Sequence, residues 1–104
     1  MMVLKEFTDL RIFHDAKIGD FKYEYNKKKL DLTLYFDFSY LKGESHLIAE
    51  NVSFVQIDSK EPWGKGIYVN EVKILKKNGR MEFSLLLNSG DKYVLHAELF
   101  LLKN

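Results

Sequence analysis

The chain has 104 residues, of which 46% are apolar and 30% charged, and this size and composition predict one globular domain, residues 1–104, around a single core. Its 16 Lys and Arg nearly balance its 15 Asp and Glu, so the net charge of +1 gives no overall attraction for nucleic acid or anionic lipid. The chain contains no Cys, which excludes disulfide bonds, thiolate catalysis and metal sites built on thiolates.

The N-terminal segment lacks the pattern of a targeting signal. Charged residues occur where a signal peptide has an apolar block, and they are Lys5, Glu6, Asp9 and Arg11. No apolar run in the chain approaches the roughly 18 residues that a membrane-spanning helix needs. We therefore expect a cytoplasmic protein with no membrane association. In the same segment, Thr8 is expected to cap a short helical turn over residues 9–13.

The strongest local pattern lies between residues 30 and 38. Five apolar side chains alternate there with other residues, and they are Leu30, Leu32, Leu34, Phe36 and Phe38. A period of two predicts a strand whose even-numbered side chains face the core. Phe21, Tyr23 and Tyr25 alternate in the same way and are also expected to face the core. Residues 26–28 have the length and polarity of a hairpin connection, so the two strands should pair antiparallel.

Residues 46–57 are rich in branched and aromatic side chains and predict a third strand. The apolar phase of this segment shifts near Glu50 and Asn51, which predicts a β-bulge there. Residues 58–66 are expected to form a loop, because Pro62 has no amide hydrogen for a strand ladder and Gly64 and Gly66 permit unusual backbone angles.

The C-terminal part predicts three strands joined by two turns. Asn78-Gly79 separates residues 69–76 from residues 81–87, and this dipeptide favours a type I′ hairpin turn. Residues 88–91 form the second turn, and it leads into a last strand on which residues 93, 95, 97, 99 and 101 share one side. Six or seven strands with no long helical segment predict an all-β domain, either an antiparallel sandwich or a small barrel.

Three short motifs follow one another along the chain. They are His14-Asp15-Ala16, then Glu61-Pro62-Trp63-Gly64 with Val69-Asn70-Glu71-Val72 downstream, and then Leu87-Asn88-Ser89-Gly90-Asp91. In this order and spacing, over about residues 14–99, the chain resembles a family of small uncharacterised bacterial proteins. More distantly it is similar to small β-rich proteins of the immunity type, which implies a role in neutralising a protein toxin. The family has no assigned activity, so the resemblance implies no catalytic residue.

Five candidate site residues lie in these motifs, and the first four are His14, Asp15, Asn70 and Glu71. An imidazole beside a carboxylate can move a proton or hold a metal, and Glu71 facing His14 or His46 would form a general-base pair. Adjacent side chains of an extended chain point to opposite faces, which favours a turn or capping role for Asp15 and a local hydrogen bond for His14. The simpler interpretation of Asn70 and Glu71, inside an apolar strand, is an exposed face with a bulge.

Trp63 is the fifth candidate. On a short turn between Pro62 and Gly64, a large indole commonly closes one end of a barrel while its N–H finds a carbonyl. The alternative is a recognition surface, since Trp is favoured where binding energy concentrates.

Lysines near tyrosines, here Lys27 to Lys29 near Tyr23 and Tyr25, are a combination that oligonucleotide-binding barrels use. These lysines lie at a hairpin end, however, where lysines discourage pairing between sheet edges. The chain also has 14 Lys and only 2 Arg, a poor composition for reading phosphates or bases. The pattern therefore argues against nucleic acid as a partner.

Three functional hypotheses follow. The first is a non-catalytic module that binds a protein partner or a second copy of itself, through a sheet face or edge and the loop around Trp63. The second is a weak hydrolytic or metal-dependent enzyme built on His14, Asp15 and Glu71. The third is an oligonucleotide-binding barrel. No cofactor is expected.

Overall fold

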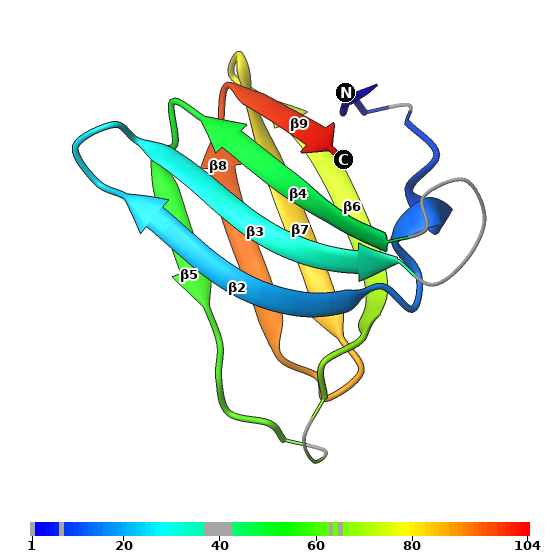
Figure 1. Cartoon of the computed structure of the whole chain (residues 1–104). Coiled ribbons are helices and arrows are strands. Elements are labelled where there is room, and N and C mark those ends of the chain that lie inside the picture. Colours follow the sequence, from blue (N-terminus) through cyan, green and yellow to red (C-terminus); the bar gives the residue numbers. More distant parts are fainter. Residues whose placement is uncertain (1, 7, 37–42, 63, 65) are drawn as a thin grey trace.

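The computed structural model describes residues 2–6, 8–36, 43–62, 64 and 66–104. These residues form two antiparallel sheets that face each other (Figure 1), with the strand orders β1-β9-β4-β3-β2 and β5-β8-β7-β6. The prediction of an all-β antiparallel domain is confirmed, and of the two expected architectures the sandwich fits the two layers. No helix among the described residues is long and apolar enough to cross a membrane.

The five-stranded sheet contains β1 (Met2–Val3), β2 (Lys17–Glu24), β3 (Lys29–Phe36), β4 (Gly43–Glu50) and β9 (Leu99–Lys103). The four-stranded sheet contains β5 (Phe54–Ile57), β6 (Val69–Lys77), β7 (Arg80–Leu87) and β8 (Lys92–Ala97). A short 3₁₀ helix, η1 (Leu10–Phe13), lies beside the sandwich (Figure 1). The described residues thus form nine strands rather than the six or seven predicted.

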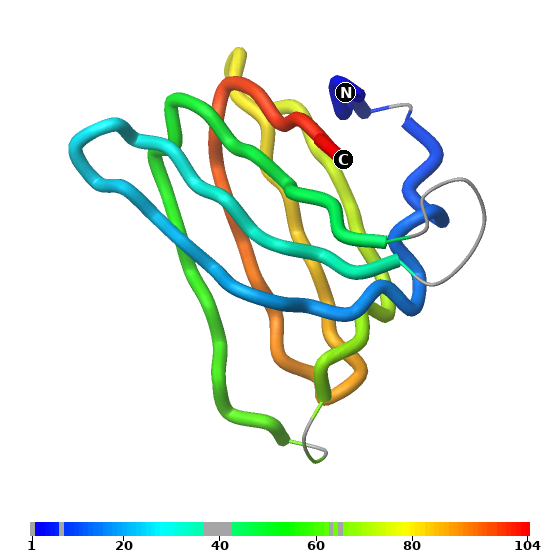
Figure 2. The backbone as a smooth tube through the Cα atoms, viewed as in Figure 1, coloured from blue at the N-terminus to red at the C-terminus, as the bar shows by residue number. Residues whose placement is uncertain are grey.

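The count is higher mainly because two predicted strands each cross from one sheet to the other (Figure 2). The first crossing follows β4 at Asn51, whose φ of 55° turns the chain away from the five-stranded sheet. The predicted bulge at Glu50 and Asn51 is therefore wrong, and the shift of apolar phase marks a change of sheet. The second crossing is at Glu98, between β8 and β9. Beyond it the burial pattern reverses, so that Leu101 does not share a side with Leu95 as predicted.

Arg80, at the start of β7, binds both crossings. Its guanidinium donates to Ser53 Oγ at 3.0 Å, to Glu98 Oε1 at 3.2 Å and to the carbonyl oxygen of Asn51. The Asn51 side-chain amide in turn donates to Glu98 Oε2 at 3.0 Å. One arginine therefore holds together the two places where the chain changes sheet.

The core lies between the sheets. On β3, Leu30, Leu32 and Leu34 are fully buried and Phe36 is 3% exposed, which confirms the inward direction of these positions, while Phe38 lies outside the described residues. Phe13 of η1 is also fully buried, and its ring centroid is 6.0 Å from that of Phe36. The 3₁₀ helix is thereby fixed to the core, because a turn this short is not stable without packing.

The ends of two elements differ from the predictions. Asp9, not Thr8, caps η1, because its side chain accepts a hydrogen bond from the backbone N–H of Arg11 at 3.1 Å. The Thr8 hydroxyl instead accepts from the backbone N–H of Lys5 at 2.8 Å. Tyr25 was expected in the core but is 70% exposed, because it lies past the last paired residue of β2.

The predicted hairpin turns are confirmed. Asn78 and Gly79 have φ angles of 50° and 79°, the two positive values that a type I′ turn requires. The strands β2 and β3 pair antiparallel, with Glu24 opposite Lys29. These turns set the register that decides which side chains meet on each outer face.

Candidate functional site

His14 and Asp15 lie between η1 and β2, beside the start of β6. Asp15 turns the chain with a φ of 67°, and its backbone N–H donates to the carbonyl of Val69 at 2.8 Å. The Nδ1 atom of His14 lies 3.0 Å from the carbonyl oxygen of Asn70. The Nε2 atom of His14 lies 3.7 Å from Asp15 Oδ2. The first motif therefore contacts the segment 69–72 through backbone groups.

Asn70 and Glu71 lie at an irregularity of β6. Val69 pairs with Leu87 and Glu71 with Leu86, so Asn70 is the extra residue of a bulge. Both side chains are exposed, and Glu71 forms an ion pair with Lys73 at 3.5 Å. The prediction of an exposed face with a bulge is confirmed.

Three of the five predicted site residues line one shallow hollow of about 330 Å³: His14, Asn70 and Glu71. The imidazole of His14 is bound to a backbone carbonyl, and the carboxylate of Glu71 to a lysine. No His14–Glu71 ion pair is formed, although a general base needs such direct contact. In the part of the chain that the structure describes, no group of three or more His, Asp and Glu side chains could hold a metal ion.

Trp63 lies outside the described residues, and the two residues before Pro62 bind the third motif. Asp91 is 4% exposed and accepts hydrogen bonds from the backbone N–H groups of Lys60 and Glu61, at 2.9 and 2.8 Å. It also accepts from Ser89 Oγ at 3.2 Å. Residues 60–61 and the Ser-Gly-Asp turn are therefore neighbours in space, and the contacts that link them build the fold.

A larger hollow, of about 800 Å³, lies on the outer face of the five-stranded sheet and was not identified from the sequence. Side chains of β2, β3, β4 and β9 and the C-terminal residue line it, and they are Lys22, Glu24, Lys29, Asp31, Glu44, His46, Ile48, Glu50, Leu101, Lys103 and Asn104. One row across the sheet consists of Lys22, Asp31, Ile48 and Leu101, paired strand by strand. The sequence feature that could have located this hollow is the set of outward-facing positions on the strands with alternating apolar residues.

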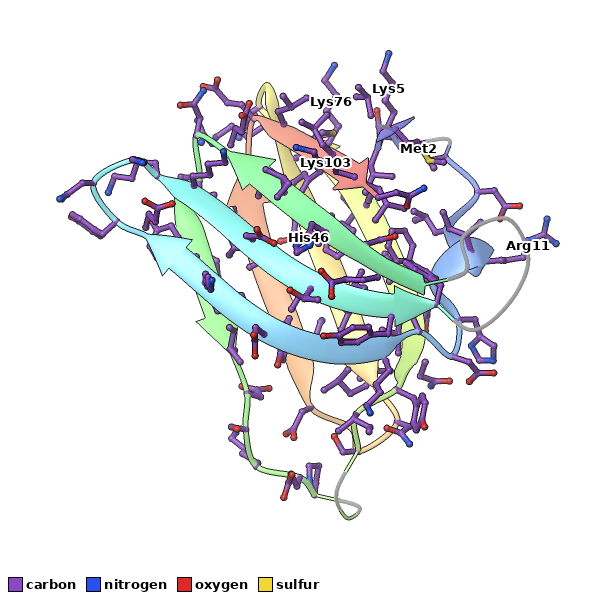
Figure 3. The ribbon with its side chains drawn as sticks, in the orientation of Figure 1. Met2, Lys5, Arg11, His46, Lys76 and Lys103 are labelled. Carbon is purple, nitrogen blue, oxygen red and sulfur yellow. The ribbon has the colours of Figure 1, made fainter. Side chains whose placement is uncertain are left out.

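His46 lies near the middle of this face (Figure 3) and is held between two carboxylates. Its Nδ1 is 2.8 Å from Asp31 Oδ1, and its Nε2 is 3.0 Å from Glu44 Oε2. Because a carboxylate only accepts hydrogen bonds, both contacts form together only when each ring nitrogen carries a proton. The bond to Asp31 raises the pKa of His46 above its ordinary value, against the effect of partial burial and with help from Glu44. The protonated form of His46, which bridges the two carboxylates, is thus favoured on the sheet.

The other charged groups of the hollow differ in their pairing. Glu24 binds Lys27 of the adjacent hairpin turn at 3.4 Å. Four further side chains form no ion pair with any described residue, and they are Lys22, Lys29, Lys103 and Glu50. The charges that are still available in the hollow are therefore mainly positive.

In comparisons with known proteins, the chain matches no family model and no curated protein. The resemblance carried by the three motifs therefore stays a prediction.

Proposed function

We propose that the protein is a non-catalytic module of the cytoplasm that binds another protein through the outer face of its five-stranded sheet. One observation carries this proposal: Ile48 and Leu101, both partly exposed, pair on this face within a rim of charged side chains. Protein interfaces have this composition, an apolar centre inside a polar rim. A toxin partner, as the immunity-type resemblance implies, is one form of the proposal.

The rigidity of the face supports the same function. The strands β3 and β4 lie inside the sheet and are paired along both edges. His46 is held by two hydrogen bonds, so its position is set before a partner arrives. A preorganised surface loses less conformational entropy on binding and therefore binds more tightly for the same contacts.

The two alternative functions have less support. An enzyme built on His14, Asp15 and Glu71 would need the imidazole to meet the carboxylate of Glu71, but these groups bind other partners. For the oligonucleotide hypothesis, the ring of Tyr25 is covered by Lys28, whose Nζ lies 3.5 Å from the ring centroid.

The test is crosslinking of the intact chain in a lysate of its own cells, followed by binding measurements with the purified partner. We expect Ile48→Glu and Leu101→Glu each to weaken binding at least tenfold, because each places a charge in the apolar centre. The control is Leu75→Glu. Leu75 is 47% exposed on β6 of the other sheet, and its replacement should leave binding unchanged.

Circular dichroism of each variant separates loss of binding from loss of fold. The proposal is wrong if folded Ile48→Glu and Leu101→Glu proteins bind the partner as the wild type does, or if Leu75→Glu weakens binding equally. Recovery of no protein by crosslinking would also contradict it.

A further inference from the structure

We infer that the occupant of the large hollow is an acidic amphipathic α-helix of the partner protein. This inference rests on the proposed function and adds the shape and charge of the segment that binds.

The dimensions of the lined face fit one helix. The lining strands β2, β3, β4 and β9 are neighbours in the sheet, so the face is three strand spacings wide, about 14 Å at about 4.8 Å each. An α-helix with its side chains is about 10–12 Å across. Along β4 the lining residues run from Glu44 to Glu50, about 20 Å at about 3.3 Å per residue. A helix of that length has about 13 residues.

An apolar floor lies on one side of this face. Ile48 is opposite Leu101, and Leu101 is opposite Val3 of β1, which is 45% exposed. The three side chains form a short apolar row that ends at the sheet edge. A helix with apolar residues at positions i, i+3, i+4 and i+7 presents a stripe that covers such a row.

The charged side chains around this apolar row determine whether a helix that binds there is acidic or basic. A protonated His46 offsets one of the two charges of Asp31 and Glu44, and Lys27 offsets Glu24, so these groups together keep a single negative charge. The side chains of the hollow that enter no ion pair with described residues are three lysines, Lys22, Lys29 and Lys103, against Glu50.

The positions of these lysines relative to the floor set where the acidic residues of the helix lie. Lys22 and Lys29 are on β2 and β3, to one side of Ile48, and Lys103 follows Leu101 on β9. A helix that seats its apolar stripe on the floor therefore needs Asp or Glu beside the stripe to pair with them.

The probe is a synthetic peptide of 14 residues, acetylated and amidated, with Leu on one helical face, Glu along both flanks and Ala elsewhere. Two matched peptides have Lys in place of Glu, or the same composition in scrambled order. Binding to the intact ¹⁵N-labelled protein is followed by NMR. We expect the Glu peptide to shift amide signals of β2, β3, β4 and β9, to gain helicity, and to bind at least tenfold more tightly than either matched peptide. Added salt should weaken this binding.

Matched charge reversals test the three lysines. The variant Lys22→Glu/Lys29→Glu/Lys103→Glu is expected to lose at least tenfold in affinity for the Glu peptide. The control, Lys73→Glu/Lys77→Glu/Lys92→Glu, changes the net charge equally at exposed positions of the other sheet and should bind as the wild type does.

The inference is overturned if the Glu and Lys peptides bind equally, or if the shifted signals belong to β5, β6, β7 and β8. It is also overturned if light scattering shows a dimer that Ile48→Glu abolishes, since the occupant is then a second copy of the chain. If no peptide binds but Ile48→Glu still removes the natural partner, the helix is wrong and the proposed binding face stands.

Discussion

Asp91 and Asp31 are two carboxylates in very different surroundings. Asp91 is buried, and its carboxylate binds two backbone N–H groups and a hydroxyl within the fold. The side chain of Asp31 is 39% exposed on an open sheet, and it binds one side chain, His46. The difference teaches that the motif carboxylate of this protein builds its fold, whereas the carboxylate at an ordinary outward strand position belongs to the proposed binding face.

The largest expected effect is the loss of the Asp91 carboxylate. Asp91→Ala removes a buried carboxylate and leaves two backbone N–H groups of the loop without their acceptor, and we expect the free energy of unfolding to fall by about 3 kcal/mol. Urea denaturation measures this change. The matched variant Asp31→Ala should cost less than about 1 kcal/mol, because an exposed ion pair contributes little. Equal losses in the two variants would remove the distinction between the regions.

A second comparison uses one glycine from each region. A β-carbon at Gly66 would lie 2.4 Å from the backbone nitrogen of Ser89, so Gly66→Ala must displace main chain in the Asp91 turn. At Gly19 the nearest atom is the ring of Tyr35, at 2.7 Å, and that exposed side chain is free to move. We expect Gly66→Ala to cost about 2 kcal/mol and Gly19→Ala less than half of that, by thermal or urea unfolding. A larger cost at Gly19 would contradict this account.

Arg80 is intermediate between Asp91 and Asp31 in its side-chain exposure and in the loss of stability that we expect when it is replaced. Its side chain is 37% exposed, yet it donates to three groups at the corners where the chain changes sheet. Arg80→Ala is expected to lower the free energy of unfolding by about 1 kcal/mol. Arg80→Lys should recover only part of this, because an ammonium cannot reproduce the planar fork of a guanidinium. Full recovery by Lys would mean that the positive charge alone holds the corners.

The all-β fold was predictable because its signals are local. Alternation on β3 and the Asn78-Gly79 turn each depend on neighbouring residues, and both predictions are confirmed. The crossings at Asn51 and Glu98 were missed because a change of sheet and a bulge both shift the apolar phase. They are told apart only by which strands pair afterwards, and that depends on long-range contacts.

The candidate site was less predictable for the same reason. The residues singled out from motifs, such as His14 and Glu71, were prominent because their types suggested chemistry. The large hollow instead combines ordinary outward positions of strands that are distant in the sequence: Asp31 lies beside Ile48 only because β3 pairs with β4 in this register. No local pattern contains that pairing. Three of the motif residues do meet in one hollow, but as part of the contact between the first motif and β6.

The smallest expected effect is the pH dependence that His46 gives to stability. Its pKa in the folded protein lies above the ordinary value of about 6.5, so its bonds to Asp31 and Glu44 stabilise the fold fully below that pH. This contribution is lost as the pH rises through the folded pKa. The stability advantage of the wild type over His46→Gln should therefore shrink as the pH rises above about 6.5, and it should never exceed about 1 kcal/mol, because the pair is partly exposed. Urea denaturation at several pH values measures it, and Asp31→Asn, which removes the stronger bond, should reduce the dependence. An advantage that grows with pH would show that the folded protein binds this proton less tightly than the unfolded chain does, which would contradict the stabilisation of a protonated His46 by Asp31 and Glu44.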